Sequence, residues 1–199
     1  MTRVLLVRHA MHDWVGRGIA GRMPSVTLNG EGELQAQDLA RRLAHVQLDA
    51  IFSSPQPRAR ETARPLAAAK GLPVTILDEF DEIAFGVWEG LTFAELEAGH
   101  AALWHEWIHR RSTVRVPGGE SFPAVRDRAM AGLRRLCDEH PQGTVLVVSH
   151  GDVIKAVAAT QLGMSLDQLE AFDIGCTSVT ILDLGPGWSQ LKQLNGTSA

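Results

Sequence analysis

Short apolar runs alternate with longer amphipathic segments along this chain, which is the pattern of strands followed by helices. Apolar runs of strand length occupy residues 3–7, 49–52, 74–77, 144–148 and 178–184, and a final short one lies near 190–194. Apolar residues recur at helical spacing within residues 29–44, 57–70, 121–136 and 152–162. Because strands that alternate with helices form parallel sheets, the pattern predicts an α/β fold with a mostly parallel central sheet.

The ends of the predicted helices are marked by side chains that favour these positions. Asn29 and Ser121 are typical N-caps, and Pro57 suits the first position of a helix. In the helix of residues 29–44, the apolar stripe that should face the core includes Leu34 and Leu39. These signals fix where three of the helices should begin.

Residues 84–119 depart from the alternation of strands and helices. They carry three of the five tryptophans, and Thr92 forms a capping box with Glu95 that should begin a further helix. We interpret this segment as a small, mainly helical insertion that rises over the sheet edge. The whole chain, residues 1–199, is then expected to form a single domain with this insertion inside it.

Composition and charge narrow the class of protein. With 199 residues, 45% hydrophobic and 21% charged, the chain is long enough for one domain with a substantial core. A net charge of −4 disfavours a nucleic-acid partner, since phosphate backbones select basic surfaces. No apolar stretch reaches transmembrane length, and no signal peptide is recognised. Cys137 and Cys176 match no metal spacing and are expected as reduced thiols in a cytoplasmic protein.

Two of the predicted strands end in nearly the same way. Residues 4–10 read VLLVRHA and residues 145–151 read VLVVSHG, so each apolar run stops at a histidine beside a small residue. Ligands of parallel sheets bind outside the carboxyl ends of the strands. We therefore expect His9 and His150 to lie in one crevice.

The same crevice should collect two arginines. Arg8 precedes the first histidine, and Arg58 follows the strand of residues 49–52 after a short Ser-Pro turn. Two fixed cations beside His9 and His150 suit a dianionic phosphate group. The second histidine also begins a helix, whose N-terminal dipole favours anions.

These residue types fit the hydrolysis of a phosphate ester. The reaction needs an in-line attacking atom, cations on the phosphoryl oxygens and an acid for the departing oxygen. A neutral histidine nitrogen can attack and form a phosphohistidine, and nearby arginines lower the imidazole pKa and keep it neutral. The acid is not yet identified, because any carboxyl of the acidic segment 78–82 could supply it.

Six motifs then occur in order along the chain: RHA at 8–10, SSPQPRA at 53–59, TA at 62–63, ExxFGxWEG at 82–90, PGGES at 117–121 and SHG at 149–151. With these motifs the chain resembles the histidine phosphatase superfamily, also called phosphoglycerate-mutase-like, over nearly its whole length. The resemblance implies a three-layer α/β/α sandwich. This agrees with the fold class that the strand and helix pattern predicts.

The resemblance also implies roles for individual residues. His9 becomes the phosphorylated nucleophile, and His150 belongs to the catalytic phosphate pocket. Glu82 becomes the proton donor to the leaving group and then the base that activates water. The residues expected to bind the substrate are Arg8, Arg58, Gly21 and Gly151.

The loop after the first histidine departs from the family pattern. The family usually has Gly, Glu and Thr where this chain has Ala10, Met11 and His12, and it often has a phosphate-contacting Asn where this chain has Val15. Ala10 adds only a methyl group, so it should be accommodated if its φ is negative. His12 and Ser54 are the two candidates to replace the missing amide.

We therefore predict a metal-independent phosphomonoester hydrolase that acts on small phosphorylated metabolites and needs no cofactor. The expected partner is a small phosphate ester, with no nucleic acid and no membrane, and a homodimer is left open. Arg17, Arg22 and Arg115 are candidates for holding a second anionic group of the substrate.

Three alternatives remain beside this prediction. A cofactor-dependent phosphoglycerate mutase shares the superfamily, although the short chain and the acidic, aromatic start of the insertion favour hydrolysis. The sequence HEWIH at residues 105–109 fits the HExxH pattern of a zinc protease, which fixes only three positions. A protein that binds phosphate without turnover is the third.

Overall fold

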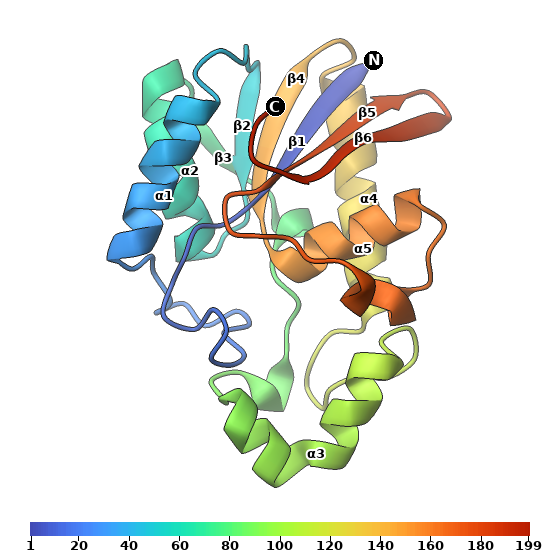
Figure 1. Cartoon of the computed structure of the whole chain (residues 1–199). Helices are drawn as coiled ribbons and strands as arrows, with labels where there is room; N and C mark the ends of the chain where they lie inside the picture. Colours follow the sequence, from blue (N-terminus) through green and yellow to red (C-terminus); the bar gives the residue numbers. More distant parts are fainter.

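A computed structural model describes all residues, 1–199, and shows a central sheet with helices on both faces (Figure 1). The strands are β1 (Thr2–Arg8), β2 (Ala50–Ser53), β3 (Val74–Ile76), β4 (Thr144–Ser149), β5 (Val179–Gly185) and β6 (Trp188–Gly196). The α-helices are α1 (Gly30–Arg42), α2 (Pro57–Lys70), α3 (Phe93–His109), α4 (Phe122–Glu139) and α5 (Gly151–Gln161). Three short 3₁₀ helices are η1 (Asp78–Phe80), η2 (Gly86–Trp88) and η3 (Leu166–Ala171). The predicted α/β fold is confirmed.

The strand order β3-β2-β4-β1-β5-β6 makes the sheet mixed. The four strands β3, β2, β4 and β1 are parallel to one another, as the pattern predicts. β5 pairs antiparallel with β1, and β6 pairs antiparallel with β5. The final strand is also longer than expected, and it forms one edge of the sheet.

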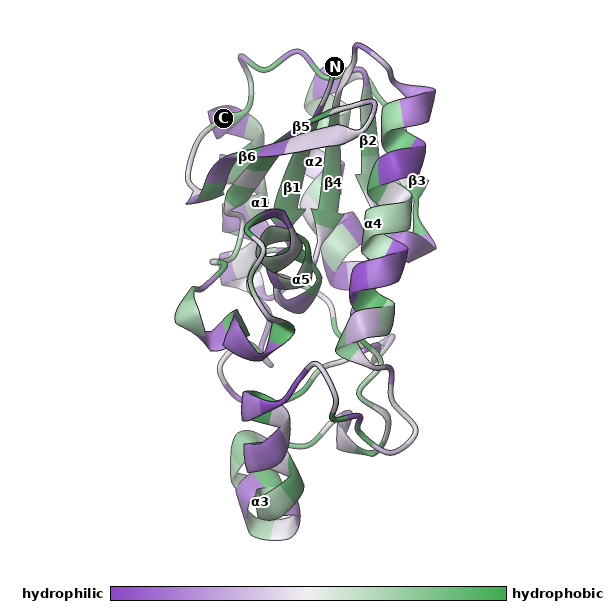
Figure 2. Ribbon diagram, turned by 90° about the vertical axis from the view of Figure 1, so that its right-hand side faces the viewer, coloured by the Kyte–Doolittle hydropathy of each residue, from purple (hydrophilic) through white to green (hydrophobic).

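Side chains that alternate along each strand build two separate cores. In β1, Val4 and Leu6 belong to the core on the α4 and α5 face, whereas Leu5 and Val7 belong to the core under α1 and α2. The inner strands are hydrophobic along their length, as Figure 2 shows, because both of their faces are covered. The chain therefore forms the expected three layers.

The predicted helix starts are confirmed, but one residue of the predicted apolar stripes lies outside the core. The Asn29 and Ser121 side chains accept hydrogen bonds from the backbone N–H groups of Gly32 and Ala124. Leu34, however, is 66% exposed, so its expected place in the core is wrong. It precedes buried Leu39 by five residues, a spacing that rotates it onto the solvent face of α1.

The insertion hangs from one end of the sheet, with α3 as its outermost element (Figure 1). The capping box of Thr92 and Glu95 begins this helix as predicted. Buried Trp88 and Trp107 lie 5.9 Å apart between ring centroids, and Trp107 lies 5.6 Å from Phe122 of α4. The apolar side chains of the insertion thus continue the core on the α4 face. That residues 1–199 form one domain stays a prediction.

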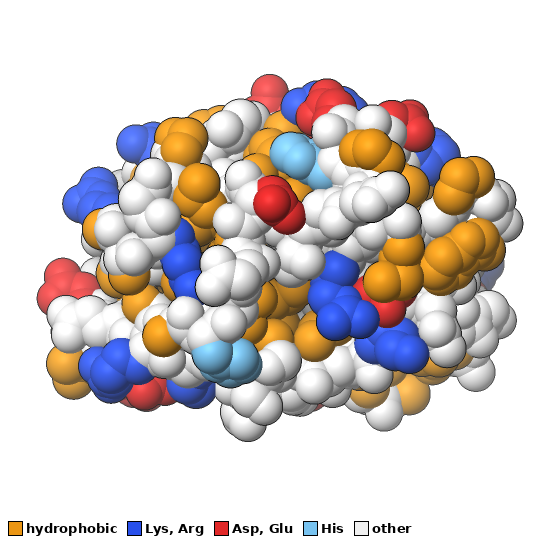
Figure 3. Space-filling view, turned by 90° about the horizontal axis from the view of Figure 1, so that it is seen from above, with side chains coloured by type: hydrophobic (Ala, Val, Ile, Leu, Met, Phe, Trp, Pro, Cys, Tyr) orange, Lys and Arg blue, Asp and Glu red, His pale blue; other side chains and the backbone are white.

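No helix of this chain combines the length and the apolar character that a membrane crossing requires. Figure 3 views the molecule from the end of the sheet that holds the N-terminus. Basic and acidic side chains are interspersed on that face, together with scattered apolar groups.

Candidate active site

The register between β1 and β4 brings the two histidines together. Arg8 pairs with Ser149 in this parallel ladder, so the residues that follow, His9 and His150, leave the sheet side by side. Their ring centroids lie 5.2 Å apart. β2 ends beside β4, and α2 begins there and carries Arg58 in its first turn. Neighbouring parallel strands therefore converge on one crevice, as predicted.

A cavity of about 210 Å³ opens at this edge of the sheet. Six of the seven predicted site residues are in its wall: Arg8, His9, Gly21, Arg58, Glu82 and Gly151. The seventh, His150, is fully buried behind them, with its Nδ1 atom 3.3 Å from Arg58 Nη2 and 3.5 Å from a Glu82 carboxylate oxygen. All seven residues therefore share one site.

The ring of His9 has a defined orientation and protonation. Its Nδ1 atom lies 2.8 Å from the carbonyl oxygen of Ala10, which can only accept a hydrogen bond, so Nδ1 carries the proton. Nε2 is then the unprotonated nitrogen. Burial, followed by the charges of Arg58 and Arg8, holds the pKa of His9 well below its usual value. The imidazole is neutral at physiological pH and is suited to nucleophilic attack.

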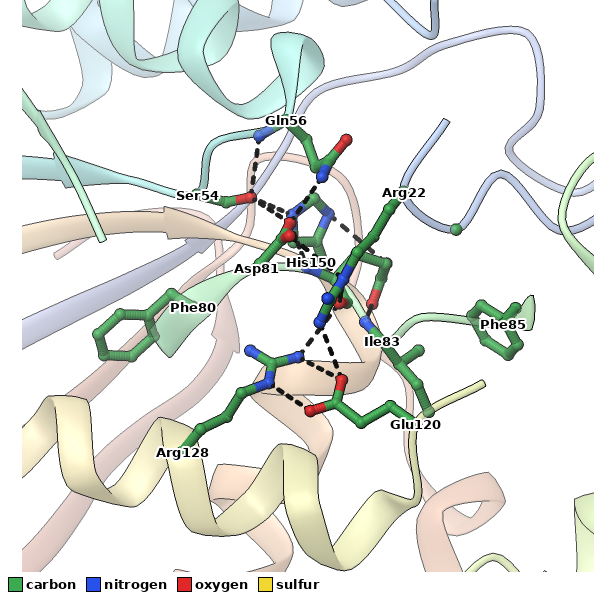
Figure 4. A network of polar contacts seen from close by, with 12 residues as sticks. Arg22, Ser54, Gln56, Phe80, Asp81, Ile83, Phe85, Glu120, Arg128 and His150 are labelled. Carbon is green, nitrogen blue, oxygen red and sulfur yellow. Dashed lines mark hydrogen bonds and ion pairs between the residues drawn. The ribbon is translucent and has the colours of Figure 1, made fainter. Parts of the chain in front are cut away.

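His150 is held by a chain of hydrogen bonds that ends on Asp81 (Figure 4). Its Nε2 atom lies 2.7 Å from Ser54 Oγ, and that hydroxyl donates to Asp81 Oδ1 at 3.2 Å. The His150 Nε2–H group therefore donates to Ser54, and Nδ1 faces Arg58. Burial and the Arg58 charge hold the pKa of His150 well below its usual value.

The two arginines are fixed by backbone carbonyls, with part of each guanidinium left unpaired. Arg58 Nη2 donates to Gly21 O at 2.7 Å, and Arg8 Nη1 donates to Ile174 O. Nε of Arg8 and both Nε and Nη1 of Arg58 are buried without a hydrogen-bond partner. Unpaired buried donors of a charged group are strongly unfavourable, which indicates a site for an anion.

The backbone of Glu82 is held by two arginines from distant parts of the chain. Arg22 Nε and Arg128 Nη2 donate to the Glu82 carbonyl oxygen at 2.7 and 3.1 Å. Glu120 bridges these arginines with ion pairs of 2.9 and 2.8 Å (Figure 4). The glutamate of the PGGES motif thus positions Glu82 and does not enter the cavity.

The carboxyl group of Glu82 is buried and points toward the histidines. Oε1 accepts a hydrogen bond from the Ile83 N–H group at 2.9 Å, and Oε2 lies 3.5 Å from His150 Nδ1. Burial, with a further contribution from Asp152, raises the pKa of Glu82 to about 8, although Arg58 opposes the shift. The group is therefore protonated at neutral pH, as a general acid requires.

The other acids of the same segment have structural contacts. Asp81 Oδ1 accepts from Gln56 Nε2 at 2.8 Å and from the backbone N–H group of Glu82 at 2.8 Å. Glu79 pairs with Arg135 at 2.6 Å on the surface. Glu82 is the one carboxyl of this run in the cavity wall, a distinction that the family motif made and the local sequence did not.

His12 is part of the site, although the sequence offered it only as one of two candidates to replace a missing amide. It is buried, lines the cavity and lies 4.8 Å from His9 between ring centroids. Its Nδ1 atom accepts from the Trp14 N–H group at 3.2 Å, so the neutral ring carries its proton on Nε2. Burial, Arg58 and Arg8 lower the pKa of His12 to about 4.

Ala10 does not have a positive φ, so the methyl group is accommodated as expected.

Three arginines proposed for a second anionic group are not in the cavity wall. The Arg17 guanidinium lies 5.9 Å from the Trp14 ring centroid, and Arg22 serves the Glu82 backbone as described. Arg115 Nε donates to Gly119 O at 2.6 Å. The structure does not support these candidates, because Arg22 and Arg115 donate to backbone carbonyls and Arg17 is exposed.

The HExxH segment on α3 does not form a metal site. His105 is exposed and pairs with Glu97 at 3.0 Å, and Glu106 pairs with Arg110 at 3.0 Å. The one group of three or more His, Cys, Asp or Glu side chains with metal-ligand spacing is His9, Glu82 and His150. The zinc-protease alternative is therefore unsupported.

The site combines three imidazoles, two guanidinium groups and one protonated carboxyl, which are the groups that a phosphatase with a histidine nucleophile requires. A family model, the histidine phosphatase superfamily (branch 1), matches residues 4–197. This chain belongs to that superfamily.

Similar proteins and solved structures agree with the assignment to this superfamily. Phosphoserine phosphatase 1 of Hydrogenobacter thermophilus is 31% identical over 197 residues, 99% of this chain and 93% of that protein. The adenosylcobalamin/alpha-ribazole phosphatase of Escherichia coli is 31% identical over 199 residues, 97% and 95% of the two chains. The solved structure of Bacillus stearothermophilus YhfR matches with a TM-score of 0.93 and 30% identity, covering 100% and 98%. The chain is an enzyme of the phosphatase type.

Proposed function

We propose that this enzyme hydrolyses small phosphomonoesters through a phosphohistidine formed on His9 Nε2. One observation carries the proposal: three buried guanidinium nitrogens of Arg8 and Arg58 have no protein partner, and these arginines line the same cavity as the neutral imidazole of His9. A phosphoryl group satisfies these donors with its oxygens. It also brings phosphorus to the nucleophile.

In the first step, His9 Nε2 attacks phosphorus while the bond from phosphorus to the ester oxygen breaks. The protonated Glu82 carboxyl transfers its proton to the departing oxygen, so that an alcohol leaves rather than an alkoxide. Arg8 and Arg58 stabilise the equatorial oxygens throughout. The products of this step are the free alcohol, phospho-His9 and the Glu82 carboxylate.

In the second step, the Glu82 carboxylate accepts a proton from a water molecule that attacks phosphorus. The N–P bond breaks, the neutral His9 is restored, and inorganic phosphate leaves. Glu82 is protonated again and ready for the next turnover. One glutamate thus acts as acid and then as base, which requires the intermediate pKa that burial gives it.

His150 and His12 are proposed as further donors to the phosphoryl oxygens. Burial and the arginine charges lower the pKa values of His12 and His150. The negative charge of a bound dianion acts in the opposite direction and raises both pKa values. His12 Nε2–H is a donor even in the neutral ring, because Nδ1 is occupied by the Trp14 N–H group. It therefore stands in for the amide that family members often have where this chain has Val15. Gly151 is proposed as a further substrate contact, and Gly21 is proposed to act through Arg58.

The charge of the cavity supports a reaction without a metal. Arg58 Nη2 lies 3.3 Å from His150 Nδ1, beside the group of side chains with metal-ligand spacing. A guanidinium at this distance repels a cation and attracts an anion. We therefore propose that turnover needs no metal and no cofactor.

Two of the relatives named above are, by their names, a phosphoserine phosphatase and an adenosylcobalamin/alpha-ribazole phosphatase, and we propose small phosphorylated metabolites for this chain. A nucleic acid or a membrane is not proposed as a partner, which the acidic net charge supports. A cytoplasmic location is proposed, supported by the free thiols of Cys137 and Cys176. A homodimer stays a hypothesis.

The proposal is tested by hydrolysis of p-nitrophenyl phosphate in EDTA, with and without vanadate, by the wild type and His9→Ala. We expect metal-independent turnover that vanadate blocks and the substitution abolishes. Turnover that EDTA removes, or that survives in His9→Ala, contradicts the mechanism. A phosphoglycerate isomerisation assay on the same preparation separates the mutase alternative, since a mutase returns the phosphoryl group to its substrate instead of to water.

A further inference from the structure

Lys155 lies in the wall of the active-site cavity and has no part in the mechanism above. It is on α5, four residues after Gly151, which borders the same cavity. Because a helix rises about 1.5 Å per residue, Lys155 is about 6 Å further along the axis and on the same face. Its side chain lines the same cavity as the phosphate-binding residues, so it can contact a part of a bound ester other than the phosphoryl group.

The Lys155 side chain is largely buried, and its ammonium group lacks a close partner. The side chain is 12% exposed, and Asp173 Oδ1 lies 3.9 Å from Nζ, beyond hydrogen-bond distance. Asp173 itself is 81% exposed, so solvent screens this pair. Nζ also lies 6.0 Å from the ring centroid of Phe172. A ligand carboxylate can approach this ammonium more closely than Asp173 does and form a charge-assisted hydrogen bond.

The other cations near the cavity are already assigned. Arg8 and Arg58 face the phosphoryl position, and the earlier candidates Arg17, Arg22 and Arg115 lie outside the cavity wall. The cavity lining also includes the apolar side chains of Trp14, Ile19 and Phe93. Lys155 is the cation in the cavity wall that remains for a second charged group of the substrate.

We propose that Lys155 binds a carboxylate on the leaving group, so that the preferred substrates are short phosphorylated hydroxy acids or amino acids. This inference rests on the phosphomonoesterase function proposed above. Asp173 then competes with the substrate carboxylate for the ammonium group. The two residues should therefore have opposite effects on the recognition of carboxylated esters.

O-Phosphoserine and O-phosphoethanolamine test this proposal because they differ only by a carboxylate. The measured quantity is the ratio of their kcat/KM values. We expect the wild type to favour phosphoserine, and Lys155→Met to lower the ratio roughly ten- to a hundredfold, the range for one hydrogen bond to a charged group. Lys155→Arg should keep most of the preference, and Asp173→Asn should increase it. Lys192→Met, which removes an exposed lysine of β6, is the matched control and should leave the ratio unchanged.

Each result decides between the two proposals. A ratio that is unchanged in Lys155→Met, or a wild type that treats the two esters alike, overturns the carboxylate site. So does a wild type that hydrolyses p-nitrophenyl phosphate but neither ester. If the wild type hydrolyses none of the three, the proposed phosphatase mechanism fails instead. Thermal melting of each variant, with Lys155→Arg as the conservative replacement, separates altered recognition from misfolding.

Discussion

The Nδ1 atom of His9 lies 2.8 Å from the carbonyl oxygen of Ala10, the next residue in the chain. This contact fixes the tautomer of the ring before any substrate binds, because a carbonyl cannot donate. Nε2 is left as the free nitrogen, and burial with the Arg58 and Arg8 charges keeps it unprotonated. The polypeptide backbone itself therefore leaves Nε2 as the nitrogen available for the proposed attack.

Substitution of His9 should remove the covalent route. We expect His9→Ala and His9→Asn to lower kcat roughly a thousandfold or more. Rapid quenching of the wild type with a radiolabelled phosphate ester should trap acid-labile label on the protein, and both variants should trap none. His45→Ala, at an exposed histidine after α1, is the control and should behave like the wild type. Label that persists in the His9 variants points to a different nucleophile.

The acid role of Glu82 should depend on the leaving group. In Glu82→Gln we expect kcat/KM for an alkyl phosphate to fall by about two to four orders of magnitude, the usual contribution of a general acid. The loss with p-nitrophenyl phosphate should be much smaller, because its phenolate departs without a proton. Asp78→Asn, an exposed acid of the same segment, is the control. Equal losses on both substrates assign Glu82 a positioning role.

The pH profile follows from the same carboxyl group. Glu82 must be protonated to donate, and its pKa is raised to about 8. The rate of alkyl phosphate hydrolysis should therefore decline as the pH rises above about 8, and this limb should be missing from the profile of p-nitrophenyl phosphate. The measurement is kcat/KM against pH for both esters, since it reports groups of the free enzyme. A shared limb on both profiles assigns the titration to another group.

Replacement of His12 should separate its donor function from its packing. His12→Phe keeps an aromatic ring beside His9 but removes Nε2–H. We expect roughly a tenfold to hundredfold loss in kcat/KM, with weaker inhibition by inorganic phosphate. His12→Gln retains an N–H donor and should keep more activity. If His12→Phe keeps more activity than His12→Gln, the tilted packing of the two rings, 4.8 Å apart between centroids, matters more than the donor.

Much of the fold follows from local sequence signals. The apolar runs locate the strands, and Asn29 and Ser121 cap helices as their side chains predict. The antiparallel direction of β5 was not predictable, because an apolar run has no direction and only its neighbours in the sheet define one. Leu34 was misplaced for a related reason, since a stripe judged by rough spacing tolerates a rotation of the helix face.

The positions of the site residues were predictable where a residue directly follows a strand of the sheet. His9 and His150 follow the last residues of adjacent parallel strands, so their meeting is a consequence of topology. Glu82 reaches the cavity from a segment without regular structure, and only the family motif distinguished it from Asp81. Lys155 gave no signal, because its significance lies in partial burial and in the distance to its partner, both of which arise from tertiary packing.

The raised pKa of Glu82 also makes the stability of the folded protein depend on pH. Its pKa is 4.5 in the unfolded chain and about 8 in the folded protein, so the folded state holds more protons between these values. Linkage then requires the Glu82 contribution to the free energy of unfolding to fall as the pH rises through this window. Glu82→Gln does not titrate, so its stability relative to the wild type should increase between pH 5 and pH 8.5, by on the order of 4 kcal/mol at most.

Chemical denaturation of both proteins at the two pH values measures this difference. Other titrating groups act in both proteins and cancel when the two are subtracted. Asp78→Asn, at an exposed position of the same segment, is the control variant. If the relative stability of Glu82→Gln is the same at both pH values, then Glu82 ionises in the folded protein as it does in solution. The carboxyl could then not supply the proton that the leaving group needs at neutral pH.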